Sequence, residues 1–152
     1  MSNSNGYIFL LWGERFEEAV ATIFVTELRE AGLRVKMVGL TLRRISGSHG
    51  LVLVPDLTLD QALPLATQAT CLVIPHSTYG LKRLKNDPRL REFFDQALAN
   101  QARLVLAQLN ETDLADLGLS HMPAVEQVMV YPVNSIKLVE FARQLANSLR
   151  VT

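Results

Sequence analysis

The sequence predicts an α/β protein with a doubly wound, mainly parallel sheet and helices on both faces. Short apolar runs of strand length alternate with amphipathic segments along the whole chain. Glycine, proline and capping residues separate these segments. The length of 152 residues suits one domain. We expect that domain over 7–152, preceded by a disordered tail at 1–6 that is too polar and uncharged for a signal peptide.

The first elements form a predicted strand–helix–strand unit. Residues 7–12 are six consecutive apolar residues, which is typical of a strand buried on both faces. Gly13 leads into a helix expected over 14–31, where apolar residues recur at helical spacing. Gly32 suits the end of this helix, and 33–40 alternates like a strand nearer the sheet edge. The two strands should be parallel, with a right-handed crossover.

The rest of the chain continues the alternation of strands and helices. A small β-hairpin with a flexible tip is expected over 45–54 and ends at Pro55. Asp87 should cap a helix whose first residue is Pro88. The other expected elements are a short helix within 59–65, strands at 71–75, 103–107 and 128–131, and a last helix over 135–150.

Composition argues against several functional classes. Fifteen basic and fifteen acidic residues cancel, so a nucleic-acid partner is not expected. A membrane partner is not expected either, because no apolar run approaches the roughly 20 residues that span a bilayer. Cys71 is the single cysteine, which precludes an internal disulfide and a CxxC motif and favours a cytoplasmic setting. It begins an apolar strand, so we interpret it as a buried structural thiol.

Cofactor and metal sites are not predicted. The loop after the first strand lacks a GxGxxG motif and a phosphate-binding cradle, which argues against a nucleotide or flavin cofactor. His49, His76 and His121 are scattered and show no metal-ligand spacing. We interpret His49, in the hairpin tip, as solvated.

The segment from Leu104 to Glu111 has the layout of a strand, a tight turn and a helix. In α/β enzymes such a turn holds the nucleophile. Here the residue at the tip is Gln108, and an amide has no ionisable proton. The sequence thus provides the frame of a catalytic elbow without a reactive atom.

Several segments in combination resemble the DJ-1/PfpI family of the class I glutamine amidotransferase-like superfamily, whose sheet is flavodoxin-like. The resemblance covers nearly the whole chain. It rests on R-F-E-E at 15–18, L-R-E-A-G-L-R-V at 28–35, the hairpin segment 47–63, C-L-V-I-P at 71–75, N-D-P-R-L-R-E-F at 86–93 and E-F-A-R-Q-L at 140–145.

The departures from this family fall in the active site that the resemblance implies. The family's nucleophilic cysteine corresponds to Gln108, and its acidic partner corresponds to Val20. His76 and Ser77 stand where the family has two glycines of an oxyanion site. A thiol enzyme of the family's type is therefore not expected, and we predict no catalytic residue.

Three functional hypotheses follow. The first is a non-catalytic domain for small-metabolite binding or protein interaction, with a pocket lined by Glu17, His76, Ser77, Gln108 and Asn110. The resemblance also implies a homodimer. The alternative is a hydrolase or lyase of altered mechanism, acting on a small carbonyl compound with His76 as base. A purely structural subunit is the third.

Two further interpretations bear on that pocket. Glu17 and Glu18 lie at the start of the first predicted helix, where negative charge complements the helix dipole. This stabilising role needs no chemistry and is the default interpretation. Trp12, at the end of the first strand, either walls the pocket or belongs to the core.

Overall fold

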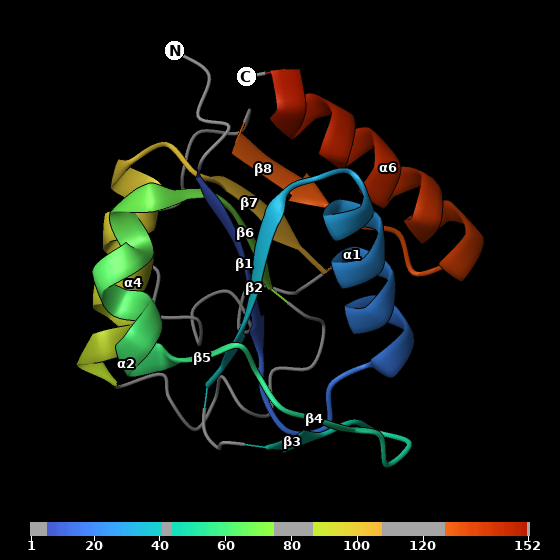
Figure 1. Ribbon diagram of the computed structural model, residues 1–152, viewed down its shortest axis with the longest axis horizontal. Coiled ribbons are helices and arrows are strands. Elements are labelled where there is room, and N and C mark those ends of the chain that lie inside the picture. Colours follow the sequence, from blue (N-terminus) through green and yellow to red (C-terminus); the bar gives the residue numbers. More distant parts are fainter. Residues whose placement is uncertain (1–5, 41–43, 75–86, 108–126, 152) are drawn as a thin grey trace.

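A six-stranded sheet forms the centre of the computed structural model, which describes residues 6–40, 44–74, 87–107 and 127–151 (Figure 1). The strand order is β5-β2-β1-β6-β7-β8, and each pairing among these described strands is parallel. The strands are β1 (Tyr7–Trp12), β2 (Arg34–Gly39), β5 (Leu57–Thr58), β6 (Ala69–Ile74), β7 (Arg103–Leu106) and β8 (Val128–Val130). The predicted doubly wound parallel sheet is confirmed.

Helices cover both faces of the sheet (Figure 1). On one face lie α1 (Glu18–Glu30) and α6 (Ser135–Val151), and on the other lie α2 (Leu59–Ala62), the 3-10 helix η1 (Leu63–Gln68) and α4 (Pro88–Ala99). As predicted, Asp87 caps α4, accepting a hydrogen bond of 2.9 Å from the Arg89 N–H. Across the helix pair on the first face, Arg143 of α6 donates a 3.0 Å bond to Glu27 of α1.

The apolar run of β1 supplies both layers of the core. Ile8, Leu10 and Trp12 pack with α1 and α6, whereas Phe9 and Leu11 pack with α4. Successive side chains of a strand point to opposite faces, so an uninterrupted apolar run fits a strand with helices on either side. Each of these five side chains is at most 1% exposed.

A small antiparallel hairpin lies beyond the carboxyl ends of the strands, next to the start of α1 (Figure 1). Its strands are β3 (Ile45–Ser46) and β4 (Val52–Leu53), which confirms the predicted hairpin. Since β1 and β2 are parallel, the loops after both strands emerge at the same edge of the sheet. The hairpin and the turn into α1 meet there.

Two elements differ from prediction for physical reasons. The first helix begins at Glu18 instead of residue 14, because the backbone of Arg15 and Phe16 bonds to the hairpin instead of continuing a helical turn. The two-residue strand β5 was not predicted, since Pro55 and Asp56 indicated only the end of the hairpin. It pairs with the end of β2 and extends the sheet by one strand.

Of the helices in the described ranges, none has both the length and the apolar character that crossing a bilayer requires.

Candidate functional site

One of the five residues expected to line a pocket, Glu17, falls within the described ranges. His76, Ser77, Gln108 and Asn110 lie outside them, so the proposed elbow at position 108 stays a prediction. Glu17 does line a cavity, with a volume of about 620 Å³.

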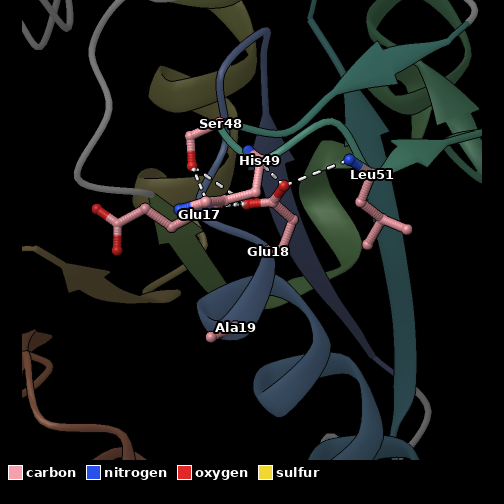
Figure 2. Close-up of a pocket in the computed structure, with 6 residues that line it drawn as sticks. All are labelled: Glu17, Glu18, Ala19, Ser48, His49 and Leu51. Carbon is pink, nitrogen blue, oxygen red and sulfur yellow. Dashed lines mark hydrogen bonds and ion pairs between the residues drawn. The ribbon is translucent and has the colours of Figure 1, made fainter.

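This cavity opens between the start of α1 and the tip of the hairpin (Figure 2). It lies at the carboxyl edge of the parallel sheet, where doubly wound folds bind their ligands. Its walls come from two segments about thirty residues apart, so no local motif could have indicated it. The described residues that line it are Glu17, Glu18, Ala19, Ser48, His49 and Leu51.

The carboxylate of Glu18 holds the hairpin tip against α1. Its Oε2 accepts hydrogen bonds from the backbone N–H of His49 at 2.7 Å and of Leu51 at 3.3 Å, and its Oε1 accepts one from Ser48 Oγ at 3.1 Å. The Glu18 side chain is only 16% exposed. Figure 2 shows these donors converging on the one carboxylate.

These contacts shift the ionisation of Glu18. Burial by itself raises the pKa, but several hydrogen bonds to the carboxylate outweigh this effect: from the Glu18 backbone, the His49 side chain, and the backbone of His49 and Leu51. Together they lower the pKa of Glu18 from 4.5 to about 2. The residue therefore carries a full negative charge at neutral pH. The interpretation of Glu18 as a helix-dipole charge is incomplete, because its carboxylate mainly serves the hairpin.

Backbone bonds join the same two segments. The N–H of Arg15 bonds to the carbonyl of Ser46 at 2.7 Å, and the N–H of Ser48 bonds to the carbonyl of Phe16 at 2.9 Å. Phe16 and Gly47 form an isolated parallel bridge. Arg15 has a φ of 64°, a left-handed conformation that non-glycine residues rarely adopt. The turn into α1 is thus shaped to fit the hairpin.

Gly47 lets the carboxylate of Glu18 approach the hairpin backbone. A Cβ atom at this position would lie 2.4 Å from Glu18 Cδ and 2.5 Å from Oε2. No side chain can occupy that space unless the carboxyl group moves.

His49 is more constrained than the sequence indicated. Its side chain is 89% exposed, which agrees with a solvated tip, but its Nδ1 lies 3.2 Å from Glu18 Oε1 and 3.1 Å from Ser48 Oγ. The ring is therefore held at Nδ1 by these two contacts. Sequence reasoning missed this pair because its members are 31 residues apart.

A carboxylate–imidazole pair of this kind can orient a histidine as a hydrogen-bonding or acid–base group. A metal site is less well supported. Within the described residues, no three His, Cys, Asp or Glu side chains are grouped so that they could hold an ion.

Cys71 is buried in β6, as predicted. Its side chain is inaccessible, and burial raises the pKa of the thiol to about 12, although Arg103 acts in the opposite direction. At neutral pH this sulfur is a protonated core atom rather than a nucleophile. Val20, where the resemblance leads us to expect the family's acidic partner, is 6% exposed and lies on the core-facing side of α1.

Trp12 belongs to the core rather than to the cavity wall. It is fully buried, and its ring lies 6.3 Å from that of Phe16. Its Nε1–H has no acceptor among the residues that the structure describes.

The chain is similar to known proteins over most of its length. The sequence profile of the DJ-1/PfpI family matches residues 7–107, so the match stops one residue before the expected elbow. A search of curated protein sequences gave no match.

Solved structures of the same superfamily share the fold at low sequence identity. A DJ-1 superfamily protein from Salmonella typhimurium is 19% identical with a TM-score of 0.70, covering 95% of this chain and 90% of its own. Drosophila melanogaster DJ-1beta is 17% identical with a TM-score of 0.72, covering 97% and 91%. A ThiJ/PfpI domain protein from Brachyspira murdochii is 14% identical with a TM-score of 0.71, covering 98% of both chains. At these identities the structures are evidence for the fold alone.

The profile covers well over half of the chain, and the sheet order, helix layers and hairpin described above agree with it. The chain belongs to the DJ-1/PfpI family.

Proposed function

We propose that this protein is a non-catalytic member of its family that binds a small metabolite in the cavity between α1 and the hairpin. We further propose that it works in the cytoplasm as a homodimer. The observation that carries the non-catalytic part is the state of Cys71. It is the only cysteine of the chain, it is fully buried, and its pKa is about 12.

The cavity supports the binding part of the proposal. It has the size of a small-molecule site, it lies at the ligand-binding edge of the fold, and Glu18 fixes the hairpin that forms one wall. A wall held in place before binding lowers the ordering cost that a ligand must overcome.

A thermal-shift screen against a broad metabolite panel tests this proposal. We expect at least one compound to stabilise the protein, because a ligand that binds only the folded state raises the midpoint of unfolding. Ala19 is exposed and lines the cavity, so Ala19→Phe should fill the space and abolish the shift. Thr26→Phe places the same ring at an exposed position of α1 outside the cavity and should leave the shift intact.

Two outcomes would contradict metabolite binding. One is a panel in which no compound shifts the midpoint. The other is a shift that Ala19→Phe leaves unchanged, because the ligand would then bind elsewhere.

Exposed apolar side chains on the hairpin support a homodimer. Val52 and Val54 are 52% and 73% exposed, and among the described strands β4 pairs only with β3. We expect a dimer by sedimentation velocity, and Val54→Lys should shift it toward monomer. Val133→Lys is the matched control, since Val133 is 87% exposed and lies outside the hairpin. A monomeric wild-type protein, or equal effects of the two variants, would refute this interface.

A further inference from the structure

We propose that the cavity takes a small primary ammonium compound, whose N–H group donates to Nε2 of His49. This inference rests on the proposed function and specifies the ligand chemistry of the same site. Its basis is the hydrogen-bonding role of each nitrogen of the His49 ring, the charge of the cavity walls and the apolar surface beside them.

The hydrogen bonds at Nδ1 fix the polarity of the ring. Glu18 is ionised, so its Oε1 can only accept, and the contact of 3.2 Å places the proton on His49 Nδ1. When Nδ1 holds the only proton of the ring, Nε2 presents a lone pair. Because the ring is 89% exposed, that lone pair is accessible to a ligand. The matching ligand group is a hydrogen-bond donor.

The charge of the walls selects a cation over an anion. Glu17 and Glu18 both line the cavity, and no lysine or arginine is among its described lining residues. Glu18 already accepts several hydrogen bonds from the hairpin tip. Glu17 makes no capping bond to its helix, and in Figure 2 its carboxylate points away from the Glu18 cluster. Glu17 is thus the group available to balance a positive charge on the ligand.

The remaining surface suits a short apolar substituent. Leu51, 44% exposed, and Ala19 line the same cavity beside the polar groups. A primary ammonium group carries three N–H donors and one positive charge, so it offers a donor to His49 and a charge that Glu17, on the same cavity, attracts. An alkyl chain on that group would lie against Leu51.

The test uses the whole chain and three small probes that each carry a short unbranched alkyl chain. Butylammonium has charge and N–H donors, butyltrimethylammonium has the charge but no donor, and butyrate has the opposite charge. Each is titrated at constant ionic strength while the imidazole ¹⁵N resonances of His49 are followed by NMR. We expect a saturable shift of Nε2 with butylammonium, at least about threefold larger than with either other probe.

Two variants locate the charge interaction. Glu17→Gln should weaken butylammonium binding by about tenfold, because it removes the balancing charge. Glu30→Gln removes a carboxylate from the far end of α1, outside the cavity, and should leave the affinity unchanged.

Each result decides between the two proposals. Equal shifts with butylammonium and butyltrimethylammonium, stronger binding of butyrate, or equal effects of the two variants would overturn ammonium recognition. If butylammonium gives no shift while the metabolite panel still yields a ligand blocked by Ala19→Phe, the ammonium inference fails and the proposed function stands. If neither experiment gives binding, both fail.

Discussion

Replacing Gly47 by alanine gives the sharpest test of how the hairpin is held. The new Cβ would lie 2.4 Å from Glu18 Cδ, whereas carbon atoms in contact are normally about 3.5–4.0 Å apart. The carboxyl group must therefore retreat by about 1 Å. Such a movement stretches its 2.7 Å bond to the His49 N–H beyond the range of roughly 2.7–3.2 Å in which N–H···O bonds form.

The ionisation of Glu18 reports this movement directly. Because hydrogen bonds hold its pKa at about 2, their loss should return the pKa toward 4.5. The assay is an NMR titration of the Glu18 side-chain carboxyl ¹³C signal from pH 6 downward. In the wild-type protein the signal should stay constant until the pH approaches 2, whereas in Gly47→Ala it should titrate above pH 3. Ser48→Ala removes one donor without a clash and should give a smaller rise.

The same shift predicts how stability depends on pH. A pKa lowered in the folded state means that the ionised carboxylate stabilises the fold above pH 4.5, and that this contribution disappears as the pH falls toward 2. Denaturant midpoints of the wild-type protein and of Glu18→Gln should therefore converge over that interval. A Gly47→Ala protein whose Glu18 still titrates near pH 2 would refute the whole account of the hairpin anchor.

Three further predictions concern the core and one helix cap. Cys71 should resist iodoacetamide at pH 8 until urea unfolds the protein, because a pKa of about 12 leaves only about one thiolate in ten thousand. Rapid labelling of the native protein would contradict its burial. Phe24→Leu should lower the free energy of unfolding by about 2 kcal/mol in urea denaturation. The reason is that the ring of Phe24 packs edge-to-face on Tyr131 and Phe141, with ring centroids 5.4 and 6.4 Å apart. A loss within error would show that these contacts contribute little. Asp87→Ala should cost about 1 kcal/mol in the same assay, whereas Asp87→Asn should retain the cap, and equal losses would argue against the capping bond.

Local patterns were sufficient for most of the sheet and helices. Both ends of the strand at 7–12 were predicted correctly, because a strand buried on both faces appears in the sequence as an unbroken apolar run. The start of α4 was predicted because Asp87 and Pro88 carry their signal within two residues. The two-residue strand β5 was missed because pairing with β2, and not its own composition, makes it a strand.

The candidate site could be predicted only in part, because distant segments make it. Glu17 was assigned to a pocket, but the sequence offered no reason to pair Glu18 with the backbone at His49 and Leu51, more than thirty residues away. The helix start was placed four residues too early for the same reason. Residues 14–17 have acceptable helical composition, and only the hairpin shows why the backbone of Arg15 and Phe16 bonds outside the helix.

The burial of Trp12 has a practical consequence for optical work on this protein. It is the only tryptophan, so its fluorescence is a single-site signal that needs no labelling or deconvolution. The indole sits in an apolar setting against Phe16, and Phe16 bridges to Gly47 of the hairpin. Emission should accordingly move to longer wavelength when water reaches this end of the sheet. The native chain thus has an intrinsic reporter at the edge where we place the ligand.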